Sequence, residues 1–299
     1  FSYIARKVDL AHAGKVEKLG LEGIGQHPDT IRTRPQGDLA SQVIGAVNEK
    51  GDGLSGLEAA EDSALKGVNG KRRIVKDALG DPIRLDHMGD SSDGKPVELT
   101  LDASIQAEAE RVLAEVGDTY SPKNASAVVM DTRTSQVLAM ANWPPVDLDH
   151  LEGASSDSLL NIGTSYTYEP GSTFKPFTVS LALDMGRVSP GTVIQTAPGK
   201  LKIGSDTIGD SHPNGALTVE QVIQKSSNVG TAKIALGLPA KSMWENYAAL
   251  GFGHAPQIGF PGAVAGRVRP YKNWRPIEQA TMSYGHGISV SLIQLARAY

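Results

Sequence analysis

Ser172 and Lys175 are the two side chains whose types and spacing best fit nucleophilic chemistry. A serine hydroxyl is a poor nucleophile at neutral pH, and a lysine can act as its base once burial or a neighbouring charge lowers the lysine pKa. Three residues apart, the two side chains lie on one face of a helix. Pro170-Gly171 breaks the chain and Pro176 is tolerated only in a first turn, which places Ser172 at a helix N-terminus. Free backbone N–H groups and the helix dipole there could stabilise an oxyanion.

The same tetrad also has a purely structural interpretation, because Ser-x-x-Lys is common in helices and a serine at a helix start most simply caps it. A second segment, Ser226-Ser227-Asn228, follows a predicted short helix that begins with a capping box of Thr218 and Gln221. This segment is either a polar loop between helices or the source of a hydroxyl and an amide for the same site. In the second interpretation Ser226 relays a proton, and Asn228 binds substrate and the lysine.

The elements that must position these residues mix helices with hairpins. Apolar residues recur at helical spacing from Ile105 to Val116, after a capping Asp102 and before a stop at Gly117. The apolar runs 125–130 and 136–140 flank a polar turn and predict an antiparallel hairpin. Further helices are predicted at 172–186, 219–225, 242–250 and 289–299. This irregular mixture favours an α+β fold over a doubly wound sheet.

Residues 1–96 are predicted to form a separate, loop-rich domain ahead of a second domain at 97–299. Helical spacing is present over 57–65, and the runs 73–76 and 83–85 flank Gly80-Asp81-Pro82, which predicts a hairpin. The polar segment 86–94 is the predicted linker or long loop between the domains. Every candidate catalytic residue lies in the second domain.

Composition excludes several other classes of function. A net charge of −4 argues against a nucleic-acid partner, and the absence of cysteine excludes disulfides, thiolate metal sites and a cysteine nucleophile. The seven histidines show no metal-ligand spacing, and no complete glycine motif for a dinucleotide or a phosphate is present. We therefore expect neither a metal nor an organic cofactor.

Three stretches of the chain together resemble the active-site motifs of the penicillin-recognising serine acyltransferases, which are the penicillin-binding proteins and the serine β-lactamases. Their flanking residues are most similar to the class B penicillin-binding proteins, the monofunctional D,D-transpeptidases of cell-wall synthesis. The stretches are 168–177 (YEPGSTFKPF), 225–230 (KSSNVG) and 281–288 (TMSYGHGI).

The resemblance extends into the first domain. Residues 32–40 (RTRPQGDLA) are similar to the pedestal motif of the class B proteins, with Arg34 where the family usually has tyrosine. Further similarities are Gly56-Leu57-Glu58 with Gly67 and Gly70, and the block 192–210, which is most similar to the septal, cell-division members.

The resemblance implies a transpeptidase domain, in which an antiparallel sheet packs with helices, after a smaller mixed pedestal domain of the dimerisation type. It implies that Ser172, activated by Lys175, forms an acyl-enzyme with peptidoglycan stem peptides ending in D-Ala-D-Ala, and that β-lactams acylate the same serine. Ser226 would shuttle a proton and Asn228 would hold substrate. The substrate contacts implied are Gly171, Ser227, Tyr284, Gly285, His286 and Gly287.

Two features of the family are not found in the chain. The lysine–serine/threonine–glycine strand, which supplies an oxyanion donor, is expected beyond Tyr299, and a membrane-anchoring helix is expected ahead of Phe1. The pedestal domain would then be incomplete and the transpeptidase domain truncated before its third motif. The resemblance also implies an extracytoplasmic or periplasmic catalytic domain at the bacterial inner (plasma) membrane. It further implies a membrane glycosyltransferase and division proteins as partners.

Two alternatives stay open on the sequence alone. A β-lactamase of the same superfamily needs a deacylating water and base, for which the chain offers no candidate. A non-catalytic β-lactam-binding receptor or division scaffold would use the first domain to dock partners. Persistent labelling by a fluorescent penicillin indicates a transpeptidase, rapid nitrocefin turnover a β-lactamase, and no labelling a scaffold.

Overall fold

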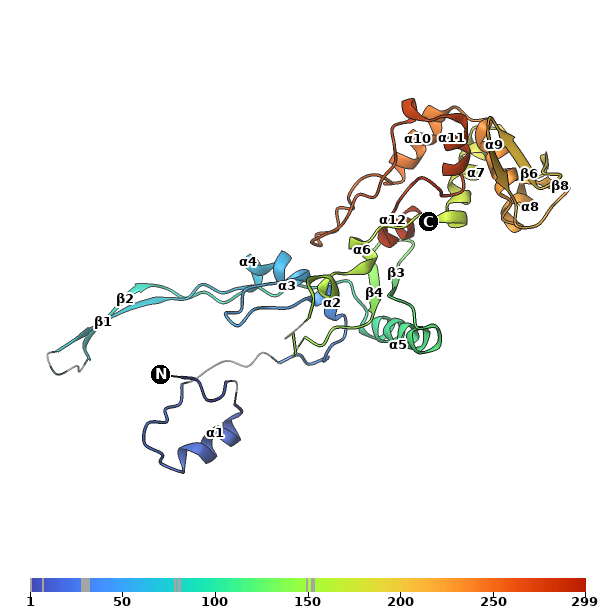
Figure 1. Cartoon of the computed structure of the whole chain (residues 1–299). Helices are drawn as coiled ribbons and strands as arrows, with labels where there is room; N and C mark the ends of the chain where they lie inside the picture. Colours follow the sequence, from blue (N-terminus) through green and yellow to red (C-terminus); the bar gives the residue numbers. More distant parts are fainter. Residues whose placement is uncertain are drawn as a thin grey trace. The chain divides into compact units, whose positions relative to one another are not determined.

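The computed structural model describes residues 2–6, 8–27, 33–77, 79, 82–148, 150–151 and 154–299 (Figure 1). The chain divides into two compact units, residues 1–38 and 39–299. The smaller unit contains helix α1 (Leu10–Glu17), whose first turn is capped by the Asp9 carboxylate through the His12 N–H, 2.9 Å away. Arg32 of the predicted pedestal motif lies outside the described residues, as do Gly80 and Asp81 of the predicted hairpin turn.

The larger unit begins with the short helices α2 (Ser41–Ile44), α3 (Gly56–Ala60) and α4 (Asp62–Leu65). The predicted hairpin is confirmed as strands β1 (Lys71–Lys76) and β2 (Pro82–Gly89), which pair antiparallel with Ile74 opposite Leu85. The predicted linker at 86–94 is wrong in part. Residues 86–89 complete β2, and Ser92 pairs with Val68 through two backbone hydrogen bonds. The backbone donors and acceptors of this polar segment are therefore used in pairing, a constraint that polarity alone does not reveal.

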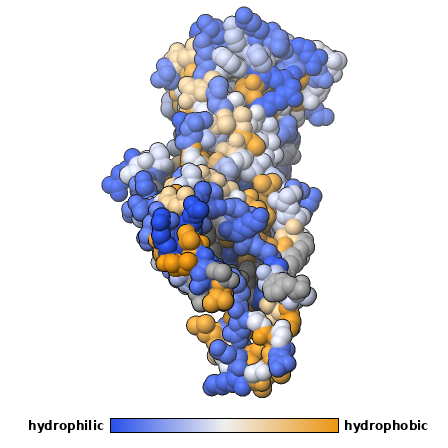
Figure 2. Space-filling view, turned by 90° about the vertical axis from the view of Figure 1, so that its left-hand side faces the viewer, coloured by the Kyte–Doolittle hydropathy of each residue, from blue (hydrophilic) through white to orange (hydrophobic). Residues whose placement is uncertain are grey.

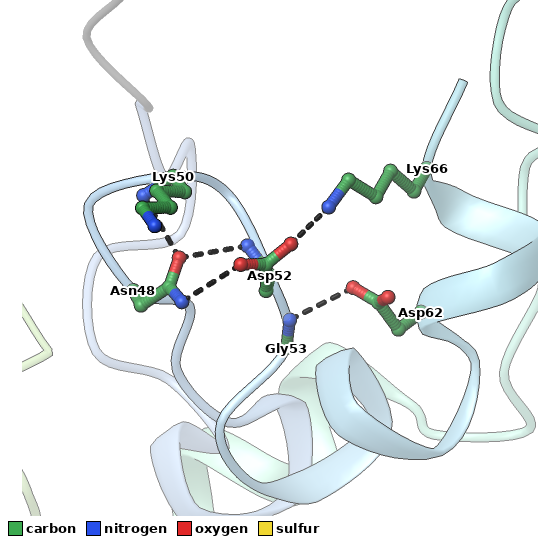
Figure 3. Close-up of polar contacts among 6 residues, drawn as sticks. All are labelled: Asn48, Lys50, Asp52, Gly53, Asp62 and Lys66. Atoms are coloured by element: carbon green, nitrogen blue, oxygen red, sulfur yellow. Dashed lines mark hydrogen bonds and ion pairs between the residues drawn. The ribbon is translucent and has the colours of Figure 1, made fainter. Parts of the chain in front are cut away.

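A polar cluster holds the loop between α2 and α4 (Figure 3). The Asn48 carboxamide accepts from the Asp52 N–H at 2.9 Å and donates to the Asp52 carboxylate at 2.9 Å, and that carboxylate also pairs with Lys66. Asp62 accepts from the Gly53 N–H at 2.8 Å, and a Cβ at Gly53 would lie 2.1 Å from the Glu58 carbonyl oxygen. These carboxylates are used to fix a tight loop.

The next layer is helix α5 (Ala103–Tyr120) on the antiparallel hairpin of β3 (Ala125–Met130) and β4 (Val137–Trp143), as predicted. Asp102 caps α5 through the N–H groups of the second and third residues after it. The expected stop at Gly117 is wrong, because the helix continues for three more residues. A Cβ at Gly117 would lie 2.3 Å from the Trp143 indole, so this glycine permits close packing of helix on strand.

Most of the remaining elements are helical. The helices are α6 (Ile162–Ser165), α7 (Lys175–Asp184), α8 (Val219–Gln224), α9 (Asn228–Leu236), α10 (Ala240–Ala249), α11 (Pro276–Met282) and α12 (Leu292–Ala298), with 3-10 turns η1 (Ser156–Leu159), η2 (Gly171–Phe174) and η3 (Tyr271–Asn273). The strands are β5 (Val193–Gln195), β6 (Lys200–Ile203), β7 (Asp206–Gly209) and β8 (Ala216–Thr218), paired β5 with β8 and β6 with β7. The capping box of Thr218 and Gln221 at the start of α8 is confirmed.

Helix α9 has no counterpart among the predicted elements. Val229, Ala232 and Ala235 have no exposed surface, and Ile234 is 5% exposed. Buried residues lie all round α9, and its polar residues Asn228, Thr231 and Lys233 are not grouped on one face, so the sequence shows no helical periodicity there.

The core next to the Ser172 turn is aromatic. Phe174 has no exposed surface, and its ring contacts those of Phe177, Tyr247 and Phe252 at centroid distances of 5.4, 4.8 and 5.0 Å. Helix α7 packs there against α9 and α10 (Figure 1). On the face drawn in Figure 2, hydrophobic residues are scattered among hydrophilic ones. No helix of the described residues is both long and apolar enough to cross a membrane.

Replacing Phe174 with alanine should cost about 3–5 kcal/mol of stability, because it empties a fully buried aromatic site. Leu183→Ala, at a 37% exposed position on the adjoining helix, is the control and should cost about 1 kcal/mol or less. Urea unfolding followed by circular dichroism measures both. Equal losses in the two variants would contradict a core centred on Phe174.

Candidate active site

The Ser172 turn is anchored on one side and open on the other. Ser172 lies in η2, which continues directly into α7, and its side chain is exposed. Phe174 and Lys175, at 0% and 2% exposure, bury the other side of the turn. Among the described residues no side chain caps η2 or α7, so the serine is not acting as a helix cap. The turn presents a hydroxyl to solvent on a rigid base.

Lys175 is the buried cation of this site. Its Nζ donates to the Ser226 carbonyl oxygen at 2.5 Å and to the Ser226 Oγ at 2.9 Å. Burial lowers the pKa of Lys175 to about 8, against the opposing charge of Asp210, which raises it. With this pKa about a tenth of Lys175 is neutral at pH 7, a far larger fraction than for an ordinary lysine, and this neutral form could act as a base for Ser172, three residues earlier. The structure thus joins Lys175 to Ser226, and Ser172 lies three residues before Lys175 in the turn that leads into α7.

Ser226 reaches Lys175 through an unusual backbone conformation. Its φ of 53° lies in the left-handed region, which costs a non-glycine residue about 1–2 kcal/mol. The bonds from the Ser226 N–H to the Ile223 carbonyl (3.0 Å) and from the Ser227 N–H to the Val222 carbonyl (2.9 Å) close this turn after α8. Strain of this kind persists only where the surroundings hold it.

Ser227 and Asp210 are those surroundings. Ser227, 1% exposed, caps α9 by accepting from the Gly230 N–H at 2.8 Å, and it donates to the Asp210 carboxylate at 2.7 Å. The other Asp210 oxygen accepts from the Val229 N–H at 2.9 Å. Asp210 was missed by the sequence reasoning. A lone aspartate after a short strand gives no spacing signal, and only the fold places it at the start of α9.

Asn228 lies on the same turn but is not bonded to Lys175. Its Nδ2 donates to the Gly209 carbonyl at 3.1 Å, which ties the end of β7 to the start of α9. Within the described part of the chain, its Oδ1 has no protein partner, so this oxygen is left to accept from a ligand.

The 281–288 segment meets the Ser172 turn through two glycines. The Gly171 N–H donates to the Gly285 carbonyl at 3.3 Å, and a Cβ at Gly285 would lie 2.2 Å from the Gly171 oxygen. Only glycine permits this approach, and the φ of 83° at Gly285 also requires it. From beneath, the Thr178 hydroxyl donates to the Ser283 carbonyl at 2.9 Å. The close approach fixes this turn beside the nucleophile.

The predicted substrate contacts of this segment differ in exposure. Tyr284 is 7% exposed and packs in the core with Ile208 and Val229, whereas His286 and Gly287 are exposed. The rings of Tyr284 and His286 contact each other at a centroid distance of 5.3 Å. In the described ranges, no three His, Asp or Glu side chains gather closely enough to hold a metal ion.

Comparison with known families and proteins gives matches over most of the chain. Residues 125–299 match the penicillin-binding protein transpeptidase domain, and residues 3–99 match the penicillin-binding protein dimerisation domain. The probable peptidoglycan D,D-transpeptidase PenA of Neisseria meningitidis is 38% identical over 100% of this chain and 52% of its own length. Peptidoglycan D,D-transpeptidase FtsI of Escherichia coli is 35% identical over 100% of this chain and 50% of its own length. The chain spans about half the length of these curated relatives.

Solved structures give the same result. Penicillin-binding protein 3 of Mycobacterium tuberculosis, complexed with aztreonam, is 32% identical, with a TM-score of 0.78 over 89% of this chain and 56% of its own. At this identity and TM-score the likeness extends beyond a shared fold to common sequence.

The lowered pKa of Lys175 predicts a pH-dependent stability. Between its value of about 8 and the ordinary 10.5, the folded chain binds fewer protons than the unfolded one. Lys175 therefore increases the free energy of unfolding as pH rises through this window, and this increase is lost as pH falls back to 8. Lys175→Met removes the effect, so the stability of the wild type relative to this variant should rise from pH 7 to pH 10.

Urea unfolding at several pH values measures this difference. Lys202→Met, at an exposed position, is the control and should follow the wild type at every pH. Parallel pH curves for the wild type and Lys175→Met would contradict the lowered pKa.

Proposed function

This chain belongs to the class B penicillin-binding proteins, nearest to their septal type, and from this premise we propose that it is a serine D,D-transpeptidase of peptidoglycan synthesis. The predicted α+β fold, with a dimerisation domain ahead of the transpeptidase domain, is confirmed by the same matches. The proposal rests on the state of Lys175, which is buried, has a lowered pKa and is hydrogen-bonded to Ser226. This lysine lies one helical turn after the exposed Ser172.

Acylation is the first half of the proposed reaction. Neutral Lys175 accepts the proton of the Ser172 hydroxyl, and the Ser172 Oγ bonds to the carbonyl carbon of the penultimate D-Ala of a stem peptide. The backbone N–H of Ser172 donates to the developing oxyanion. The bond to the terminal D-Ala breaks, and Ser226, 2.9 Å from Lys175, passes the lysine proton to the leaving amine.

Deacylation reverses these roles. An amine from a neighbouring stem peptide attacks the acyl-enzyme carbonyl, and its proton passes through Ser226 to Lys175. The ester bond to Ser172 then breaks as Lys175 returns this proton to the Ser172 Oγ. The cross-link is formed and the serine hydroxyl is restored with no change in oxidation state and no cofactor.

The proposed substrate contacts follow exposure. We propose that the Asn228 Oδ1 and the exposed His286 and Gly287 contact the donor peptide, and that Gly171 borders the nucleophile. We assign Ser227 and Tyr284 supporting roles, because both are buried. Gly285 acts through its close approach to Gly171.

The wider setting is proposed from the relatives. We place the pedestal domain at residues 1–96 and the transpeptidase domain at 97–299. An N-terminal helix outside this chain would anchor the protein in the inner (plasma) membrane, with catalysis on the extracytoplasmic or periplasmic side. A membrane glycosyltransferase and division proteins are its proposed partners. The aztreonam complex of the Mycobacterium tuberculosis protein supports β-lactams as acylating inhibitors here.

Mass spectrometry of the intact full-length protein, after hours with excess penicillin, should distinguish the roles of Ser172 and Ser226. Ser172→Ala should gain no drug mass, because it lacks the bond-forming oxygen. Ser226→Ala and Asn228→Ala should be acylated about 10²–10⁴-fold more slowly, yet reach the correct adduct mass, since they lose a proton relay or a positioning contact.

Ser180→Ala is the matched control, since Ser180 is exposed on α7 and its hydroxyl donates locally, to the Phe177 carbonyl. It should be acylated at the wild-type rate. Adduct on Ser172→Ala but none on Ser226→Ala would assign the nucleophile to the second motif. Rapid nitrocefin turnover would indicate a β-lactamase.

The acylation rate should rise with pH through an apparent pKa of about 8, because only neutral Lys175 accepts the serine proton. Asp210→Asn removes a charge that raises this pKa, so its profile should shift to lower pH. Stopped-flow acylation by a fluorescent penicillin between pH 6 and pH 10 measures both profiles. A rate that stays flat to pH 10 would exclude Lys175 as the base.

A further inference from the structure

The segment that leads into Ser172 contains a hinge. Gly171, directly before the nucleophile, has a φ of 58°, and a Cβ there would meet nothing within 4 Å. Glycine is therefore required at this position for its backbone freedom and not for packing. Because glycine restricts its own backbone little, the position of the Ser172 Oγ depends on contacts that hold Gly171 from outside.

Residues 168–171 are held by residues 285–290. Tyr168 and Val290 exchange two backbone hydrogen bonds of 3.0 Å each, and the Gly171 N–H reaches the Gly285 carbonyl at 3.3 Å. The last of these is the bond nearest the hinge, and it is long for an N–H···O bond.

Glu169 supplies a shorter link between the same two segments. Its Oε1 accepts from the Gly287 N–H at 2.8 Å, and its Oε2 lies 3.8 Å from the His286 Nδ1. A hydrogen bond to a carboxylate is roughly twice as strong as one between neutral groups. The Glu169 side chain is 55% exposed, so its burial contributes little and its contact with Gly287 is its main interaction with the fold.

We propose that Glu169 is a positioning residue, whose carboxylate holds the 285–288 turn against the Ser172 turn and thereby fixes the nucleophile for attack. The inference rests on the proposed acylation of Ser172. Loss of this bond frees the Gly171 hinge, and small displacements of reacting atoms are costly in rate. The step affected is bond formation, not binding of the acylating molecule.

The test is stopped-flow acylation of the full-length protein by a fluorescent penicillin, with the dissociation constant and the acylation rate constant measured separately. Glu169→Ala should lower the acylation rate constant roughly 10- to 100-fold, with little change in the dissociation constant. Glu169→Gln keeps an acceptor oxygen for the Gly287 N–H and should recover most of the rate. Glu220→Ala, an exposed glutamate in the first turn of α8, is the matched control and should behave as the wild type.

Three outcomes would overturn the inference. A Glu169→Ala rate equal to that of Glu220→Ala means that the bond does not position the serine. A Glu169→Gln rate as low as that of Glu169→Ala means that charge, not the hydrogen bond, matters. A loss confined to the dissociation constant means that Glu169 contacts the ligand.

Two measurements keep this result distinct from others. Glu169→Ala could also melt at a lower temperature than the wild type. In that case, a Glu169→Gln variant that melts at the same lowered temperature but acylates near the wild-type rate still supports positioning. Failure of the wild type to be labelled, or labelling of Ser172→Ala, is a failure of the proposed function and not of the Glu169 contact.

Discussion

The burial of the Lys175 ammonium is the interaction on which the site depends. A charge removed from water must find partners or lose its proton. Here it finds the carbonyl and hydroxyl of Ser226, and its pKa is lowered to about 8. The burial that comes with packing α7 against the junction of α8 and α9 therefore also lowers the pKa of the proposed base. Asp210 limits the effect, since its negative charge favours the protonated lysine.

The junction itself is held by bonds that serve stability and chemistry together. Ser227 caps α9, Asp210 accepts from both Ser227 and Val229, and the strained backbone of Ser226 lies between α8 and this cap. A fold that stabilises the start of α9 thus also fixes the carbonyl and hydroxyl that receive Lys175. The position of the proposed base is therefore a consequence of helix capping.

On the other side of Ser172, glycine permits a close approach of two backbone segments that a larger residue would prevent. Gly285 lets two backbones meet beside Ser172, and the aromatic cluster around Phe174 anchors the buried side of the turn. The backbone at Ser172 is held because its neighbours in the chain are buried or bonded, although its own side chain is open to solvent. Ser172 therefore combines a solvent-accessible side chain with a backbone that is held in place.

The sequence alone determined the helix start at Ser172 and Lys175, both hairpins and the Thr218 capping box, because these depend on residues within one or two turns of each other. Tertiary structure decided the rest. Helix α9 is buried on several sides and shows no helical period in the sequence. The need for glycine at 117 comes from the Trp143 indole of another element, and Asp210 reaches Ser227 only after folding. The pKa of Lys175 likewise follows from burial, and burial is a property of the packed chain and not of any local pattern.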